Sequence, residues 1–123
     1  MKVRIIRVLS IGIMLMGLVH IVATFTPLIA SKLAILPDSA QGAFTYFSLM
    51  CGALLVLGGV VTFTLSGRVT EYAFIRVPYA LTLATLFIDG MLAAYYMPLN
   101  PFAWIIFALV IGLILANVKK FQA

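Results

Sequence analysis

The sequence predicts an all-α integral membrane protein: a single domain over residues 1–123 that forms a transmembrane four-helix bundle with both termini in the cytoplasm. Three observations predict this class: an apolar composition, four long apolar runs, and basic residues that gather beside one set of run ends. Hydrophobic residues make up 65% of the chain and charged residues 9%, against about 25% charged in an ordinary soluble domain. With so little polar surface, much of the chain must face lipid.

Four runs are long enough to cross a bilayer, which takes about 20 mostly apolar helical residues. They are residues 5–26, 43–65, 75–97 and 102–118. The last run reaches only ~25 Å at ~1.5 Å per residue, so we expect it to stand upright. The first run follows a basic segment like that of a secretory signal. It is too long for one and lacks a small-residue cleavage site, so we expect a retained helix.

Basic residues are divided unequally between the two sides of the predicted membrane. If the four runs cross the membrane in alternating directions, Lys32 lies alone on one side and the other seven basic residues lie on the other. The seven are Lys2, Arg4, Arg7, Arg68, Arg76, Lys119 and Lys120. Because cytoplasmic loops carry the excess of Lys and Arg, that side and both termini are expected in the cytoplasm of a bacterial cell, with the spans in its inner membrane. The net charge of +5 is therefore interpreted as a topology signal and not as nucleic-acid binding.

The link 27–42 is long and rather apolar, and Ile29, Leu33 and Leu36 fall at helical spacing within it. This pattern predicts a short interfacial helix that caps the bundle. Asp38 followed by Gln41 resembles a capping box that starts the second membrane helix.

Prolines lie near the other predicted helix ends. Pro27 and Pro78 are expected near helix ends, with a kink at Pro78 as the alternative. Pro98 and Pro101 lie in a link so short that the last two helices must be antiparallel neighbours. Aromatic residues at the outer helix ends predict an interfacial belt. They are Tyr46, Tyr95, Tyr96 and Trp104.

Small residues at helical spacing predict where the helices pack, because membrane helices associate through close backbone approach and polar contacts. The first helix carries Gly12 and Gly17. The second carries Ser48, Gly52 and Gly59, and the fourth carries Ala108, Gly112 and Ala116. We interpret these stripes as packing within the bundle in preference to a dedicated dimer face.

Two ionisable residues, His20 and Asp89, interrupt apolar runs in the first and third helices. Counted from the cytoplasmic edges, they rise ~18 Å and ~20 Å, so they reach nearly the same depth in the outer half. Thr82 and Thr85 share the face of Asp89, and Thr24 shares that of His20. These five residues predict a small polar focus inside the bundle.

The polar focus has two interpretations. It locks the first helix to the third, or it is a ligand-binding or proton-titrating site, because intramembrane ionisable residues are functional candidates. A direct His20–Asp89 contact would lower the cost of burying both groups.

Other chemistry finds little support in the sequence, and we predict no enzymatic activity. Cys51 is the only cysteine, which excludes an internal disulfide and a cysteine-built metal site. The single histidine argues against haem, and no nucleotide loop, carboxylate cluster or metal-ligand spacing occurs. No cofactor or metal is predicted. No repeat relates the two halves, so an inverted-repeat transporter is not supported.

The segment "IGIMLMGLVHIVATFTP", with a basic N-terminus before it, resembles the DoxX-like group of small bacterial four-helix membrane proteins. The likeness rests on the G-x-x-H motif from Gly17 to His20, the proline after it, and the overall size and layout. The resemblance implies a compact helical module. Some members of the group act as membrane subunits beside redox or quinone-linked partners, and no catalytic residue is carried over.

Three functions follow. The sequence favours an accessory or scaffold subunit that contacts a larger membrane partner within the bilayer. The first alternative is a binder or carrier of a lipophilic small molecule, a lipid or quinone, with polar contacts from His20, Asp89, the threonines, or Tyr95 and Tyr96. The second is a small proton-coupled transporter, for which so few helices would require a homodimer.

Overall fold

The structure, a computed structural model, describes residues 2–121 and the side chains of residues 2–118. It is all-α. Its five helices are α1 (Lys2–Thr24), α2 (Pro27–Leu33), α3 (Asp38–Leu65), α4 (Ala73–Tyr96) and α5 (Pro101–Phe121). The four helices other than α2 are long and apolar enough to cross a membrane, as the sequence predicted.

The helices extend beyond the predicted apolar runs at several ends. Helix α1 includes the basic segment from Lys2, and α3 starts at Asp38, five residues before the run 43–65. A helix that leaves the hydrocarbon layer does not need apolar residues to continue, so hydropathy marks the membrane crossing and not the helix end. The acid of Asp38 in the first turn of α3 also suits the helix dipole.

The link 27–42 contains the predicted short helix, α2, with Pro27 at its first position. None of its residues is buried, so it lies against the bundle only lightly. The predicted capping box is wrong: Pro37 is the N-cap residue of α3, and no side chain caps this end. Because the helix starts one residue earlier than expected, Gln41 donates instead to the backbone oxygen of Leu36, at 2.7 Å.

Pro78 lies inside α4, because that helix begins upstream at Ala73. The proline is within the first two turns, near the start of the helix.

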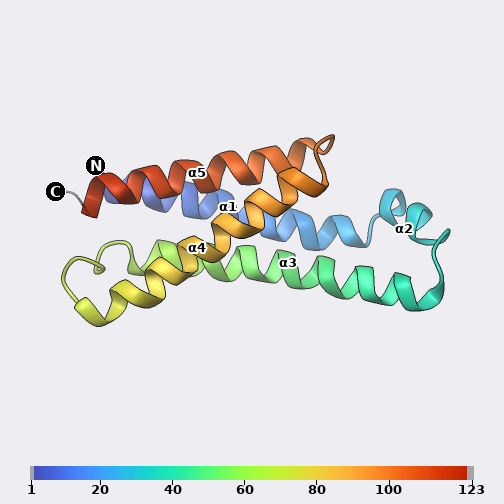
Figure 1. Cartoon of the computed structure of the whole chain (residues 1–123), viewed down its shortest axis with the longest axis horizontal. Helices are drawn as coiled ribbons and strands as arrows, with labels where there is room; N and C mark the ends of the chain where they lie inside the picture. Colours follow the sequence, from blue (N-terminus) through green and yellow to red (C-terminus); the bar gives the residue numbers. More distant parts are fainter. Residues whose placement is uncertain (1, 122–123) are drawn as a thin grey trace.

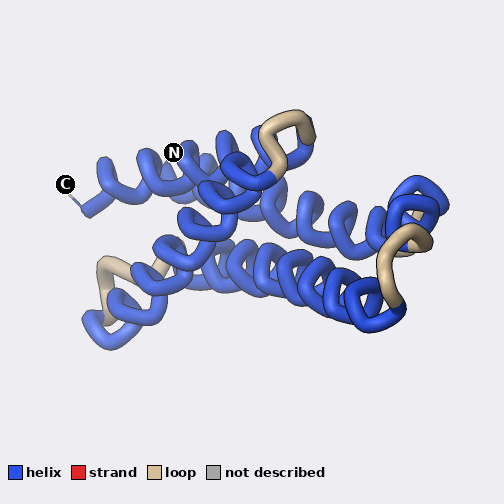
Figure 2. Tube along the Cα trace, turned by 45° about the vertical axis from the view of Figure 1, so that its right-hand side comes forward, coloured by secondary structure: helices blue, strands red, loops and turns tan. Residues whose placement is uncertain are grey.

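The four long helices form a closed ring in which α1 packs on α3 and α5, and α4 packs on the same two helices. Helices α1 and α3 run side by side, and α4 crosses the bundle obliquely (Figures 1 and 2). The start of α1, the end of α5 and the α3–α4 link lie together at one end (Figure 1). The basic residues of the chain other than Lys32 therefore belong to one end of the bundle, and α2 to the other.

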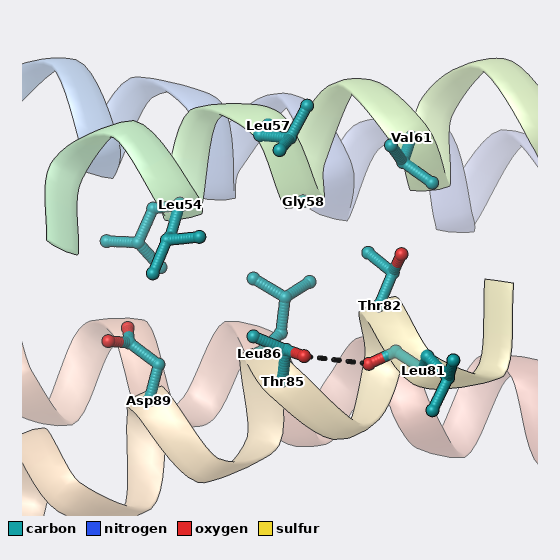
Figure 3. A pocket seen from close by; sticks show the side chains of 10 residues that line it. Leu54, Leu57, Gly58, Val61, Leu81, Thr82, Thr85, Leu86 and Asp89 are labelled. Carbon is teal, nitrogen blue, oxygen red and sulfur yellow. Dashed lines mark hydrogen bonds between the residues drawn. The ribbon is translucent and has the colours of Figure 1, made fainter. Parts of the chain in front are cut away.

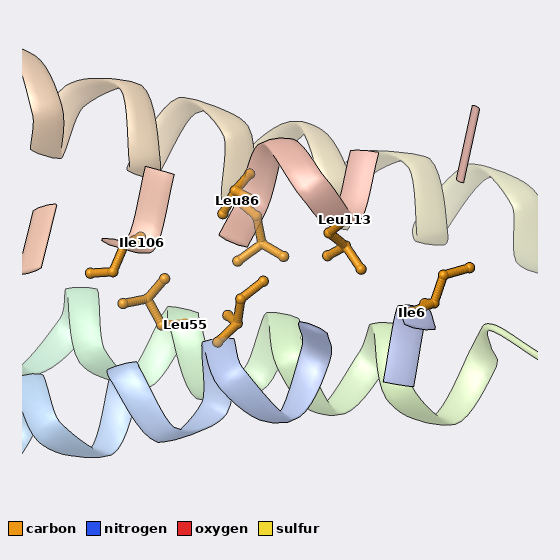
Figure 4. Close-up of a cluster of buried hydrophobic side chains, with 7 residues drawn as sticks. Ile6, Leu55, Leu86, Ile106 and Leu113 are labelled. Carbon is orange, nitrogen blue, oxygen red and sulfur yellow. The ribbon is translucent and has the colours of Figure 1, made fainter. Parts of the chain in front are cut away.

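A central apolar cluster fills the bundle with side chains from all four long helices (Figure 4). Its buried members are Ile6, Ile13, Leu55, Leu86, Ile106, Val110 and Leu113. Near the basic end, the Tyr79 hydroxyl donates to Oδ1 of Asn117 at 2.9 Å and joins α4 to α5. Both residues are fully or almost fully buried.

Glycines bring the backbones of α1 and α3 into direct contact. A Cβ atom added at Gly17 would lie 2.8 Å from the carbonyl oxygen of Gly52, and one at Gly59 would lie 2.8 Å from that of Ser10. These distances are too short for a real Cβ, so the two helices approach this closely only because glycine stands there. The Ser10 and Thr62 hydroxyls add a buried hydrogen bond of 2.8 Å at this interface.

The other predicted packing residues have more varied surroundings. Gly12 faces Leu109 of α5 closely, whereas Gly112 has only ordinary contact distances to Leu9. Ala116 is half-buried, and Ala108 is exposed, so the predicted stripe on α5 is wrong at Ala108. Helix α5 packs mainly through larger side chains. Its buried face consists of Ala103, Ile106, Val110, Leu113 and Asn117.

We predict opposite effects for the same substitution at two helical glycines. Gly17→Ala forces α1 away from α3 and should lower the free energy of unfolding by about 1–3 kcal/mol. At Gly42 of α3 an added Cβ meets nothing within 4 Å, so Gly42→Ala should be neutral or stabilise by up to about 1 kcal/mol. Unfolding in mild detergent measures both. Equal effects would contradict a close α1–α3 contact.

Candidate functional site

Polar side chains of α1 and α4 meet α3 along one stretch, which carries Ser48 and Cys51. Ser48 faces α1, where it contacts His20 and Thr24, and Cys51, one turn later, contacts Asp89 of α4. The spacing of three residues between Ser48 and Cys51 lets one helix serve both neighbours. Two residues of the predicted polar focus, His20 and Thr24, therefore meet at Ser48, and Asp89 bonds Cys51 separately.

On the α1 side, three hydrogen bonds close a ring. The Thr24 hydroxyl donates to the backbone oxygen of His20 at 2.9 Å, and its oxygen lies 2.7 Å from Oγ of Ser48. Oγ of Ser48 lies 3.2 Å from Nε2 of His20. Each hydroxyl has one hydrogen. All three bonds therefore form together only when Ser48 donates to Thr24 and the Nε2–H of His20 donates to Ser48.

On the α4 side, the Cys51 thiol donates to Oδ1 of Asp89 at 3.1 Å. The second carboxyl oxygen, Oδ2, is buried and has no hydrogen-bond partner. A buried polar atom without a partner costs about 1–3 kcal/mol, and more when it is charged. Among the described residues, Oδ2 of Asp89 is thus the one buried side-chain oxygen or nitrogen without a hydrogen-bond partner.

No hydrogen bond joins His20 to Asp89 directly. Helices α1 and α4 stand at opposite corners of the ring, with α3 between them on this side. The two residues are still near enough for an electrostatic interaction. Instead of bonding each other, His20 contacts Ser48 and Asp89 contacts Cys51.

A groove of about 210 Å³ lies between α3 and α4, and we name it the α3–α4 groove (Figure 3). Its apolar walls include Leu54, Leu57, Val61, Leu81 and Leu86. Its polar lining is Asp89, Thr82 and Thr85. Gly58 also lines the groove. A Cβ atom there would lie only 2.6 Å from Leu86, so glycine at this position lets α3 and α4 approach each other closely.

The two threonines of the groove do not bond Asp89. The Thr82 hydroxyl donates to the backbone oxygen of Pro78 at 2.8 Å, and that of Thr85 donates to Leu81 at 2.9 Å. Both are bonds to the preceding turn of the same helix, which is common for threonine in membrane helices. Only their oxygen lone pairs remain for another partner.

His20 lines a different hollow, of about 130 Å³, among residues of α1, α2, α3, α5 and the α4–α5 link. We name it the His20 cavity. It is lined in part by His20, Thr24, Ser48, Phe44, Asn100 and Phe102. The structure thus divides the predicted polar focus into two sites, one at His20 and one at Asp89.

Tyr95 and Tyr96, the other predicted candidates, lie outside both hollows. They are 75% and 74% exposed and pack edge-to-face on each other, with ring centroids 5.0 Å apart. Their position at the end of α4 suits the predicted aromatic belt.

Sequence reasoning assigned Ser48 to packing and gave Cys51 no polar role. The signal that could have found them is their spacing, because Ser48 and Cys51 fall on the polar side of α3 that also carries the packing glycine Gly52. Among the described side chains, no group of three His, Cys, Asp or Glu residues could hold a metal ion.

No family model, no curated protein and no solved structure matches this chain. The resemblance to the DoxX-like group stays a prediction, and the function must be argued from the geometry.

We predict that Ser48 and Thr24 are energetically coupled. Ser48→Ala and Thr24→Val should each lower the free energy of unfolding by about 1 kcal/mol, because each breaks bonds of the same ring. The double variant should lose less than the sum. Ser31→Ala is the control, because its hydroxyl is exposed and bonds only Leu28 of its own helix. Strictly additive losses in detergent unfolding would contradict the ring.

Proposed function

We propose that this protein binds a lipophilic small molecule in the α3–α4 groove, with the polar group of the ligand at Asp89. The observation that carries the proposal is the buried Oδ2 of Asp89, which lacks a partner at the edge of an apolar hollow. An intramembrane acid is costly to keep, by at least ~2.5 kcal/mol on insertion scales. A ligand that bonds Oδ2 offsets that cost.

The groove is suited to receive a molecule from the bilayer. Leu57 and Leu81 at its rim are 58% and 62% exposed, on a surface that faces lipid when α3 and α4 span the membrane. Apolar walls with a few convergent polar groups are typical of small-molecule sites. The ligand would approach sideways from the bilayer and needs no aqueous path.

A second candidate is the accessory subunit that the sequence favoured. The observation in its favour is that the links between spans are short, so contacts with a partner would lie mostly within the bilayer. A Lys or Arg of a partner span would then be the group that meets Asp89. The proton-coupled transporter and the homodimer that it requires stay predictions without an added observation.

We further propose that the protein lies in the bacterial cytoplasmic membrane with both termini in the cytoplasm. The support is the gathering of the basic residues other than Lys32 at the bundle end that holds both termini.

This orientation predicts which thiol an impermeant reagent can reach. In a Cys51→Ala background, a cysteine at Ser39 should be labelled in intact cells, and a cysteine at Thr70 of the α3–α4 link only after lysis. The reverse labelling pattern would overturn the orientation.

For the ligand itself, we predict opposite effects of Asp89→Asn on binding and on stability. Retention of a co-purifying lipophile should fall about tenfold, because a charge-assisted hydrogen bond contributes about 1.5–3 kcal/mol. The free energy of unfolding should not fall, because the variant removes a carboxyl that lacks a full set of partners.

Native mass spectrometry after purification in mild detergent measures ligand retention. Glu71→Gln is the matched control, because it makes the same change at an exposed acid in the α3–α4 link. A stoichiometric partner protein that leaves on Asp89→Asn would support the subunit instead. Equal lipophile retention by both variants would contradict the groove as the site.

A further inference from the structure

We propose that the ligand of the α3–α4 groove is a membrane-soluble amine: a cationic nitrogen with N–H groups, carried on one apolar chain. This inference rests on the proposed function and names the class of molecule that the groove recognises. It follows from hydrogen-bond bookkeeping, from charge and from the shape of the hollow.

With Asp89 ionised, the groove offers hydrogen-bond acceptors and no donors. The hydroxyl hydrogens of Thr82 and Thr85 are already donated to Pro78 and Leu81. The thiol hydrogen of Cys51 is donated to Oδ1 of Asp89. What remains at the polar wall are lone pairs on Oδ2 of Asp89 and on the two threonine oxygens. A complementary ligand must therefore donate hydrogen bonds.

The charge of Asp89 also determines which ligand the groove can bind. Each Lys and Arg of this chain lies near a helix end or in a link, and no ion pair with Asp89 occurs among the described side chains. The nearest basic group, His20, faces the other hollow and uses Nε2 on Ser48. An ionised Asp89 is thus short of a counter-ion, and an ammonium head supplies both the charge and the donors.

The shape of the groove suits a single alkyl chain. From Asp89 to Leu81 the groove follows eight positions of α4, which is ~12 Å along the helix. The walls beyond the threonines are leucine and valine side chains (Figure 3). A single alkyl chain can lie along them with its head at Asp89. A ligand with polar groups along its length would leave those groups unpaired there.

Because Oδ2 is buried, a ligand reaches it only when a neighbouring side chain moves, and Leu54 is the one that we expect to move. Leu54 lines the groove together with Asp89 and is 41% exposed (Figure 3). An exposed leucine can change rotamer without disturbing the buried core. Leu54→Ala should therefore strengthen binding or leave it unchanged.

The test compares three probes that each carry a dodecyl chain, in a neutral detergent: dodecylamine, dodecanol and 2-tetradecanone. Their heads are a cationic donor, a neutral donor that also accepts, and an acceptor only. Native mass spectrometry should rank them in that order, with dodecylamine bound at least about tenfold better than the ketone. Asp89→Asn should abolish the preference for the amine, and Glu71→Gln should preserve it.

A second pair of variants keeps Asp89 and so separates binding from folding. Leu57→Trp fills the groove and should reduce dodecylamine binding. Leu115→Trp, at an α5 position of equal 58% exposure, should not. Unchanged binding in Leu57→Trp would overturn the groove as the amine site.

The outcomes distinguish the two proposals. Ketone binding equal to or tighter than amine binding would overturn the amine class and leave the proposed function standing, with Asp89 acting as a donor. Failure of all three probes to bind, in a preparation without a bound lipophile, would overturn the proposed function itself.

Discussion

The close contact of α1 with α3 is the constraint on which the rest of the molecule depends. In lipid, apolar side chains gain little by meeting one another, so helices need near backbone contact or polar bonds to associate. Gly17, Gly52 and Gly59 allow the near backbone contact between α1 and α3. Ser10 and Ser48 form the polar bonds. The remaining two helices complete the ring against this pair.

This contact also determines where chemistry can occur. With one side of α3 held against α1, its next turn presents Cys51 to α4 and leaves space for the α3–α4 groove. Helix α4 touches α3 closely at Gly58 and is tied to α5 by Tyr79 near the basic end. Asp89 therefore lines a hollow while its Oδ2 atom stays buried without a partner.

The features set by the bilayer could be predicted from the sequence, and those set by helix rotation could not. The four spans follow from apolar length, and the gathering of one set of ends follows from the links and the basic residues. Ala108 and the capping box at Asp38 were assigned wrongly, because spacing alone does not tell which face of a helix is buried or at which residue it starts. For the same reason the roles of Ser48 and Cys51 could not be predicted. Only the order of the helices around the bundle shows that α3 lies between His20 and Asp89.

The hydrogen-bond ring of His20, Ser48 and Thr24 makes Ser48 a selector of the histidine tautomer. With the hydrogen of the neutral imidazole held on Nε2, a second proton can be added only at Nδ1. Addition there breaks none of the three bonds, because the imidazolium still donates from Nε2 to Ser48. The α1–α3 junction can therefore carry a neutral or a charged histidine with the same set of bonds.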